Sequence, residues 1–175
     1  MTEPRRWSVY MKVSSAASIG DIKGPVRDRD PLKNGSIALL GVEHVVASPR
    51  DAATGLSTGK RRHFPMTILK EPDETSPLFY QLIATNGQIS SVDLIYFGSD
   101  NRFGLTSDRE IQLYTITLTS VFVSEIALSG QSGDEPDDRG RIGVKERISF
   151  VYESVRWKWN DPRVEASDTF NPRNS

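Results

Sequence analysis

Residues 110–128 constrain the fold of this chain most, because they have the pattern of extended backbone and are too long for an ordinary strand. Their apolar side chains change parity twice, in the pairs Ile111 and Leu113, then Ile116 and Leu118, then Val121 and Val123. Since successive side chains of a strand point to opposite faces, both faces of this stretch are apolar over part of its length. A lone small barrel has one interior, so the surplus apolar surface favours a subunit whose outer face meets a neighbour.

Residues 144–160 show the same change of parity near the end of the chain. The apolar residues first occupy even positions and then odd ones, in the order Ile148, Phe150, Tyr152, Val155, Trp157 and Trp159. A strand that exchanges its buried face needs a bulge or two different burial partners. We therefore expect Trp157 and Trp159 to be buried in the core or against a neighbouring subunit, with a sugar-binding platform as the alternative.

The choice of residues elsewhere also favours strands. The 175 residues include 13 Val, 12 Ile and 11 Thr but 9 Ala, and β-branched side chains suit a pleated, half-buried surface. The predicted fold is mainly β, an antiparallel two-sheet barrel with one short helix. We expect a single domain over residues 1–160 and a flexible C-terminal tail over residues 161–175, where apolar residues are few.

The one helix is predicted over residues 76–86. The run Thr75-Ser76-Pro77 supplies a capping hydroxyl and then a proline near the first helical position, and Asn86 followed by Gly87 ends the helix. Four apolar residues follow one helical face, namely Leu78, Phe79, Leu82 and Ile83. A helix of about ten residues needs tertiary packing to persist, so this face is expected to cover part of the core.

Composition excludes several classes of chemistry. The chain has no cysteine, which rules out disulfides, zinc–thiolate sites and iron–sulfur clusters. A formal net charge of −1 argues against a nucleic-acid partner, and no run approaches the ~18 apolar residues of a membrane helix. The two histidines, His44 and His63, lie in no motif for a nucleophile or a base. We predict no catalytic residue, no metal site and no cofactor.

The segment from Pro49 to His63 is rich in turn residues and leads into a basic run. Its glycines resemble a phosphate-binding loop, but three residues rather than four separate Gly55 from Gly59, and a strand follows instead of a helix. We expect a projecting hairpin-like loop whose basic end is either solvated or in contact with another protein. The residues assigned to a subunit contact are Pro49, Arg50, Asp51, Thr54, Gly55, Gly59, Lys60, Arg61, Arg62 and His63.

Four segments taken in order resemble one known family. They are His44–Asp51, Thr54–His63, Lys70–Leu78, and Glu146–Trp159 with its Tyr-x-x-Val-x-Trp pattern. Together they are similar to the Hcp family, the haemolysin-coregulated proteins that form the tube of the bacterial type VI secretion system. The resemblance covers roughly residues 37–97 and 110–160, whereas the first 36 residues match poorly.

This resemblance implies a homohexameric ring with a wide pore. Rings would stack into a tube inside a contractile sheath, and the tube would carry the spike protein VgrG and effectors out of the cell. The implied route runs from the bacterial cytoplasm through the type VI machine, without a signal peptide. Residues 49–62 would correspond to the extended loop that reaches neighbouring subunits and rings. The rival interpretations are a contractile phage-type tail-tube protein and a small-molecule-binding β-barrel.

Overall fold

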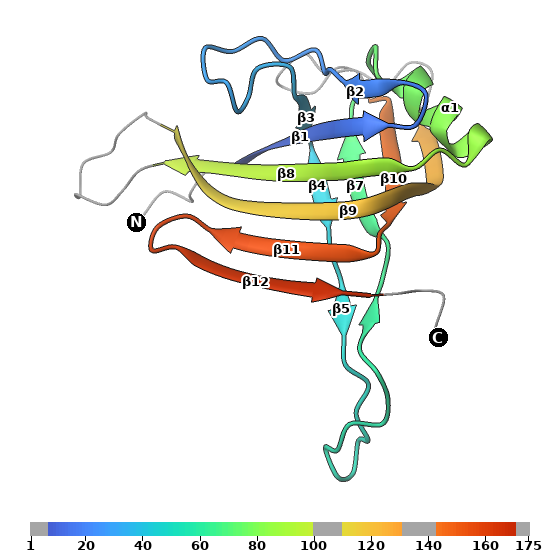
Figure 1. Cartoon of the computed structure of the whole chain (residues 1–175), viewed down its shortest axis with the longest axis vertical. Coiled ribbons are helices and arrows are strands. Elements are labelled where there is room, and N and C mark those ends of the chain that lie inside the picture. Colours follow the sequence, from blue (N-terminus) through green and yellow to red (C-terminus); the bar gives the residue numbers. More distant parts are fainter. Residues whose placement is uncertain (1–6, 100–109, 131–142, 171–175) are drawn as a thin grey trace.

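The computed structural model describes residues 7–99, 110–130 and 143–170. This part of the chain forms a mainly β structure with one helix, drawn in Figure 1. The elements are β1 (Trp7–Ala16), β2 (Gly20–Ile22), β3 (Ile37–Leu39), β4 (Gly41–Glu43), β5 (Val46–Ala47), β6 (Arg62–His63), β7 (Met66–Lys70), α1 (Ser76–Thr85), β8 (Ile89–Ser99), β9 (Glu110–Ser129), β10 (Lys145–Val151), β11 (Ser154–Trp159) and β12 (Val164–Thr169).

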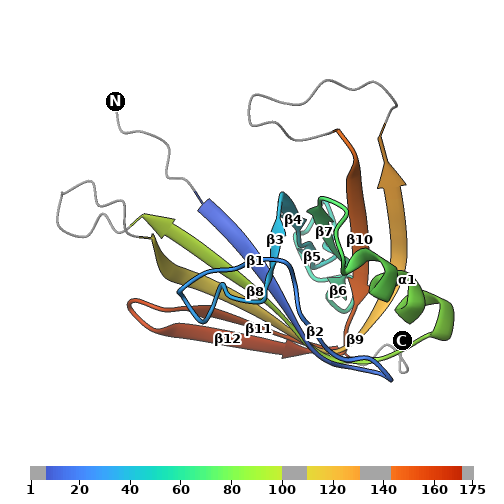
Figure 2. The same cartoon turned by 90° about the horizontal axis from the view of Figure 1, so that it is seen from above.

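Two antiparallel sheets share strand β9. The first sheet has the order β12-β11-β9-β8-β1, with β2 and β3 both beside β1, and the second has the order β9-β10-β7-β4. The first part of β9, up to Val121, pairs with β8, and the part from Phe122 to Ser129 pairs with β10. Figure 2 shows β9 running along the first sheet and then turning into the second. The unusual length of residues 110–128 therefore follows from one strand serving two sheets.

A row of three serines lies where the first sheet turns. Ser15, Ser90 and Ser120 fall at neighbouring register positions of β1, β8 and β9, and the Ser90 hydroxyl donates to the Ser15 carbonyl at 3.3 Å. Ser15 and Ser120 have positive φ angles of 52° and 51°, which small polar residues tolerate better than β-branched ones. A residue with positive φ changes which positions of the strand point to a given face. In β1 and β9 the buried side chains before and after the serine therefore have opposite parity in the sequence but lie on the same face of the sheet.

The parity changes of β9 were expected to place apolar side chains on both faces of the strand. They come instead from a left-handed serine and a register shift within the strand. Leu118 and Val121 lie on opposite parities but are both buried in one core, at 0 % exposure, because Ser120 lies between them. A register shift in the β8–β9 pairing between Tyr96 and Phe97 accompanies the earlier change near Leu113. The interpretation as surplus apolar surface is therefore wrong for Ile116, Leu118, Val121 and Val123, which all belong to one core. Ile111 and Leu113 are only partly buried and lie outside this core, so their covering by a neighbouring subunit stays a prediction.

The change of parity over residues 144–160 coincides with a change of sheet. The chain leaves the second sheet after β10 and enters the first sheet as β11, with Tyr152 and Glu153 between them. Phe150 and Val155 lie on opposite parities and are both buried in the one core between the sheets. The expected pair of different burial partners is therefore replaced by a break between two strands that face the same core.

The mainly β, two-sheet class with one helix is confirmed, but the barrel is not closed. β3 pairs with β1 in the first sheet, and β4 pairs with β7 in the second. Leu40 joins β3 to β4, and no ladder between the described strands links β3 to β7. At the junction the Leu40 N–H donates to the Leu69 carbonyl at 2.7 Å, but β3 itself forms no ladder with β7, and the two sheets form an open wedge (Figure 2).

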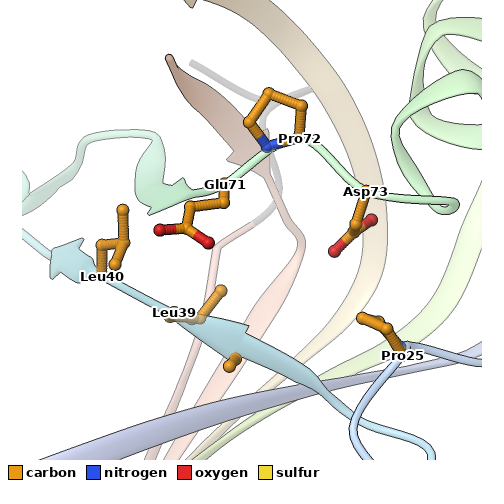
Figure 3. A pocket seen from close by; sticks show the side chains of 7 residues that line it. Pro25, Leu39, Leu40, Glu71, Pro72 and Asp73 are labelled. Carbon is orange, nitrogen blue, oxygen red and sulfur yellow. The ribbon is translucent and has the colours of Figure 1, made fainter. Parts of the chain in front are cut away.

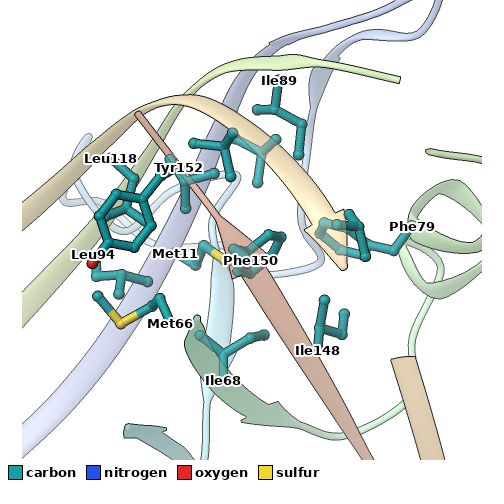
Figure 4. Close-up of a cluster of buried hydrophobic side chains, with 14 of the residues drawn as sticks. Met11, Met66, Ile68, Phe79, Ile89, Leu94, Leu118, Ile148, Phe150 and Tyr152 are labelled. Atoms are coloured by element: carbon teal, nitrogen blue, oxygen red, sulfur yellow. The ribbon is translucent and has the colours of Figure 1, made fainter. Parts of the chain in front are cut away.

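The core fills the space between the two sheets. Met11 and Leu94 from the first sheet meet Met66, Ile68 and Phe150 from the second, all with 0–1 % exposure (Figure 4). Helix α1 covers the end of this core, and the ring of its Phe79 lies 6.1 Å from the Phe150 ring at 66°. Burying large apolar side chains of this kind contributes roughly 1.5–3 kcal/mol each.

The predicted helix over residues 76–86 is confirmed, with Asn86 ending it in the left-handed conformation (φ 50°). The predicted capping bond is wrong, because Thr75 makes no side-chain cap. Its hydroxyl instead donates to Asp73 Oδ1 at 2.5 Å, and the same oxygen accepts the Thr75 backbone N–H at 2.8 Å. An Asx-type turn before the helix therefore replaces the cap.

A buried ionic cluster lies beside the start of α1. Lys70 and Glu146 are both 0 % exposed, and Lys70 Nζ lies 3.1 Å from Glu146 Oε2 and 3.1 Å from Asp73 Oδ1. Lys70 Nζ also donates to the Glu71 carbonyl at 2.7 Å and to the Ser76 hydroxyl at 3.0 Å. Four oxygen acceptors around one ammonium compensate for its removal from water.

The segment between β2 and β3 covers the outer face of the first sheet. Lys33 lies over the Phe97 and Tyr10 rings, with Nζ 4.6 Å and 5.4 Å from their centroids, and forms an ion pair with Glu110. Gly24 approaches Ser36 so closely that an added Cβ would lie 2.1 Å from the Ser36 carbonyl oxygen. The early residues that match the resembled family poorly are thus packed onto the sheet.

The expected flexible tail over residues 161–175 needs correction. Val164–Thr169 forms β12, which pairs along its whole length with β11 at the edge of the first sheet. This segment has little apolar content and is ordered by its backbone pairing with β11. The Phe170 N–H extends the pairing by donating to the Glu153 carbonyl at 2.6 Å. Residues 171–175 lie outside the part of the chain that the structure describes.

Candidate assembly surfaces

Residues 46–63 form a projecting hairpin, called the hairpin below. Its base is the short β5–β6 pair, with Val46 opposite His63 and Ala47 opposite Arg62. Beyond the base, the Thr58 N–H donates to the Pro49 carbonyl at 3.1 Å, and an isolated bridge joins Arg50 to Ser57. Figure 1 shows the hairpin extending away from both sheets, at the end of the molecule opposite α1. The prediction of a protruding hairpin-like loop is confirmed.

The tip of the hairpin is organised by Asp51. Its Oδ1 accepts the Thr54 N–H at 2.7 Å, the Thr54 hydroxyl at 2.8 Å and the Ala53 N–H at 3.1 Å. The hydrogen bonds from Thr54 lower the pKa of the Asp51 carboxyl. Gly55 follows with φ +69°, a conformation that favours glycine, and its carbonyl accepts the Arg50 guanidinium at 3.1 Å. The tip is thus a defined turn held by polar contacts.

Almost the whole hairpin is exposed to solvent. Leu56 near the tip is 68 % exposed, the highest value among the exposed large apolar side chains of the described chain. Lys60 is exposed, and the Arg62 guanidinium lies 5.9 Å above the ring of Phe64. The structure therefore brings all ten residues predicted for a subunit contact into one projecting element. Its exposed cations and its exposed apolar side chains Val46 and Leu56 can contact a partner without disturbing the fold.

At the base of the hairpin, Arg61 and His63 contact the C-terminal strand. The Arg61 guanidinium donates through two nitrogens to both carboxylate oxygens of Asp168 in β12. His63 Nε2 lies 2.8 Å from Asp168 Oδ2. The Arg61 guanidinium is the main cause that lowers the pKa of Asp168 to about 2, and the same contact raises the pKa of Arg61.

A chain of hydrogen bonds continues from His63 into the protein. His63 Nδ1 lies 3.2 Å from the Tyr152 hydroxyl, which lies 3.2 Å from His44 Nε2. Since the Asp168 carboxylate only accepts, His63 donates from Nε2, and in its neutral form it accepts at Nδ1 from Tyr152. The Tyr152 hydroxyl oxygen then accepts a hydrogen bond from the Nε2–H of His44. Burial lowers the pKa of His44 and raises the pKa of Tyr152 to about 12.

Sequence reasoning missed Tyr152, Asp168 and the ring of Phe170, which lies 5.7 Å from the His63 ring. Tyr152 was assigned only to an apolar face, and the other two fell in the expected tail. His44, which lies in no catalytic motif of the sequence, has a hydrogen-bonded structural role through its contact with Tyr152. An acid such as Asp168 in a polar C-terminal segment carries no sequence signal for pairing with a residue more than 100 positions away.

Trp157 and Trp159 are both partly buried in this single chain. The Trp157 ring stacks on His44, with centroids 5.7 Å apart and 20° between planes, and packs against the core. The Trp159 ring joins a cluster at the open end of the wedge, 6.3 Å from Trp7 and 6.2 Å from Tyr114. Tyr96 completes the cluster, 5.5 Å from Tyr114, and burial raises its pKa to about 12. Covering of these rings by a neighbouring subunit stays a prediction.

Two surface cavities lie away from the core. One of about 360 Å³ is lined by Pro25, β3 and the turn before α1, with the side chains of Glu71 and Asp73 at its edge (Figure 3). The other, of about 590 Å³, lies beside the hairpin base and is lined by residues that include Phe64, Thr67 and Ser149. Thr67 and Ser149 alternate with buried core residues, so this cavity is on the outer face of the second sheet. Neither cavity lies in the interior that a small-molecule-binding barrel uses.

Neither a metal-binding cluster nor a membrane-spanning helix is present in the described part of the chain. Within residues 7–99, 110–130 and 143–170, no three His, Asp or Glu side chains come together in a group that could hold a metal ion. In the same ranges no helix is both long and apolar enough to span a bilayer.

The sequence of this chain matches one protein family and a curated relative. Residues 10–159 match the model of the family described as "Type VI secretion system effector, Hcp". A curated relative from Pseudomonas aeruginosa, named "Major exported protein", is 23 % identical over 132 residues, which are 75 % of this chain and 73 % of the relative.

Solved structures of Hcp proteins have the same fold as this chain. The structure titled "Crystal structure of Hcp protein" aligns with a TM-score of 0.78 at 18 % identity, covering 93 % of this chain and 99 % of the other. The Hcp1 protein from E. coli EAEC 042, as a double mutant, aligns with a TM-score of 0.75 at 25 % identity, covering 94 % and 99 %. The secreted protein Hcp3 from Pseudomonas aeruginosa aligns with a TM-score of 0.71 at 17 % identity, covering 95 % and 99 %.

Proposed function

The chain belongs to the Hcp family of type VI secretion proteins, and on that premise we propose that it is a structural subunit of the secretion tube. Six copies form a closed ring, and rings stack into the tube that carries the spike protein VgrG and effectors inside the sheath. The protein is made in the bacterial cytoplasm and leaves the cell through this machine. It works by assembly, without catalysis or a cofactor.

The observation that carries this proposal is the projecting hairpin. It is exposed along its length, held in shape by its own polar contacts, and distant from the core. An element that contributes little to the fold but keeps a defined shape is suited to contact another molecule. Residues 49–62 also correspond to the extended loop of the family that the sequence resembles.

The wedge itself supports assembly as a ring. Exposed strand β12 forms one edge of the first sheet, and the aromatic cluster at the open end of the wedge is only partly covered. Unpaired edges and partly covered rings suit a heterologous interface, in which one surface of a subunit meets a different surface of the next. A heterologous interface that closes on itself produces a ring.

Electrostatics supports weak, reversible stacking between rings. Arg50, Lys60 and Arg62 make the hairpin basic, and exposed ion pairs are individually worth about 0–1 kcal/mol and screened by salt. Six equivalent contacts per ring interface still give useful avidity. We propose the acidic residues at 134–138 of another subunit as the partner of the hairpin; this segment lies outside the described residues.

Replacing Ala52–Thr58 with a short Gly-Ser turn tests the proposal. We expect a folded hexamer that no longer forms tubes and no longer supports secretion, measured by gel filtration, electron microscopy and a secretion assay. Tyr80→Ser on α1, at the other end of the molecule, is the control for removing an exposed apolar side chain. Tubes and secretion at wild-type levels in the hairpin variant would remove the stacking role, and loss of the hexamer would assign the hairpin to the contact within the ring.

A further inference from the structure

Strand β12 lies outside the segment that matches the family model, which ends at residue 159. In the described chain it pairs only with β11, and most of its side chains are exposed. Asp168 differs from its neighbours on the strand, because its side chain is only 16 % exposed and is directed at the base of the hairpin. This contact joins the C-terminal strand to an element more than 100 residues earlier.

The contact is strong by its chemistry. The Arg61 guanidinium donates to both oxygens of the Asp168 carboxylate, and His63, whose side chain is 3 % exposed, donates to one of them at 2.8 Å. Charge-assisted bonds with a two-point geometry fix orientation as well as distance. Tyr152 holds the other nitrogen of His63, so the ring between Asp168 and the core cannot turn freely.

The hairpin's own backbone pairing is short, and apart from Asp168 its base is joined to the body through the His63–Tyr152 hydrogen bond. Its own base consists of two residue pairs, and the Phe64 N–H adds a bond to the Val45 carbonyl at 3.1 Å. A two-stranded ribbon of this size is marginally stable alone. Without the contact from β12, the hairpin could therefore keep its turn and still swing relative to the two sheets.

We propose that Asp168 is a positioning residue for assembly: through Arg61 and His63 it fixes the direction of the hairpin relative to the body. The inference rests on the proposed stacking role of the hairpin. Six hairpins held in one direction before rings meet lose less conformational freedom on stacking, which strengthens each weak contact. The C-terminal strand thereby controls assembly without itself touching the next ring.

The test compares Asp168→Asn with Glu165→Gln in the full-length hexamer. Asparagine keeps the shape of Asp168 and one acceptor oxygen but loses the charge and the two-point contact. Glu165 is the matched control, because it is an acid on the same strand that makes only peripheral ion pairs, with Arg156 at 3.9 Å and Arg163 at 3.5 Å. Hydrogen exchange of the hairpin peptides, tube counts by electron microscopy and the hexamer fraction are measured for each.

In Asp168→Asn we expect exchange over residues 46–63 to rise about tenfold or more, with exchange in β7 and β10 unchanged. The hexamer persists, tubes become scarce, and Glu165→Gln behaves as wild type. Unchanged hairpin exchange in Asp168→Asn would overturn the proposal. The proposal would also be overturned if Asp168→Asn showed faster hairpin exchange but formed as many tubes as the wild type.

A second variant covers the case in which Asp168→Asn folds poorly. Arg61→Lys keeps the positive charge on an exposed side chain but cannot make the two-point contact. We expect intermediate exchange and fewer tubes, and wild-type values for both would contradict the proposal. If the wild-type protein forms no tubes under any condition, the proposed function fails, while the exchange comparison still decides whether Asp168 holds the hairpin.

Discussion

The two-sheet body and the hairpin are stabilised in opposite ways. The body buries a continuous apolar core between its sheets, with Phe150 and Met66 fully enclosed and a buried ion pair at one end. The hairpin buries almost nothing and keeps its shape through turn hydrogen bonds around Asp51. The difference shows that folding and assembly depend on separate sets of residues in this chain. The Asp168 contact is the place where the two sets meet.

The largest effect on the body is expected from the buried ion pair. Lys70→Met should cost about 3–5 kcal/mol of unfolding free energy, because it leaves the fully buried Glu146 carboxylate without its cation. Chemical denaturation measures this loss, and the double variant Lys70→Met/Glu146→Leu should recover most of it. A loss below about 1 kcal/mol in the single variant would contradict the role of Lys70 as the partner that compensates the buried Glu146.

A smaller effect is expected where the body is only partly covered. Trp157→Ala should cost about 2 kcal/mol, below the ~3–5 kcal/mol of a fully buried tryptophan, because the ring is partly exposed and stacks on His44. The midpoint of denaturation is the measurement. An unchanged midpoint would show that this face of β11 contributes nothing to the core.

Acid should weaken the contact between body and hairpin. The pKa of Asp168 is lowered to about 2, so its stabilising contribution is fully present above its unfolded pKa of ~3.9 and is lost as the pH falls through about 2. Denaturation of the wild type and Asp168→Asn at pH 7, 4 and 2 should give a stability difference that shrinks toward pH 2. Arg61 and His63 face the carboxylate from the hairpin, and Tyr152 contacts His63 from the body. The same series run with Glu165→Gln, which leaves this contact intact, serves as the control. A difference that is constant over this range would contradict the assignment.

The smallest effect on stability should come from the hairpin itself. Replacing Ala52–Thr58 with a Gly-Ser turn should change the unfolding free energy of the protomer by less than about 1 kcal/mol, because the segment buries little area and loop closure depends weakly on length. Thermal melting monitored by circular dichroism checks this. A loss of several kcal/mol would mean that the hairpin belongs to the folding unit, and the distinction between the two regions would fail.

Much of the body could be predicted from sequence, because local patterns determine it. The two-sheet class, the helix over residues 76–86 and the protruding hairpin follow from β-branched content, helix boundaries and turn residues. The parity changes of β9 were visible, but their cause was not, because a left-handed serine such as Ser120 has no distinctive sequence signature. Lys70 and Glu146 fall on the buried parity of adjacent strands, and that placement is the signal that could have revealed the ion pair.

The contact between the two regions could not be predicted. β12 is a polar edge strand whose order comes from backbone pairing with β11, and such pairing leaves little trace in residue pattern. Asp168 and Arg61 are 107 positions apart, so only the assembled sheets bring them together. The residues assigned to the hairpin were correct as a group, but the anchor that holds them lay in the segment expected to be a tail.

The central claim is that six copies of this body form a closed ring, and the mass in solution tests it most directly. Light scattering coupled to gel filtration at micromolar concentration should give about six times the 19.5-kDa chain, and the mass should stay the same in the variant that lacks Ala52–Thr58. A single species at 19.5 kDa across this concentration range would contradict the account.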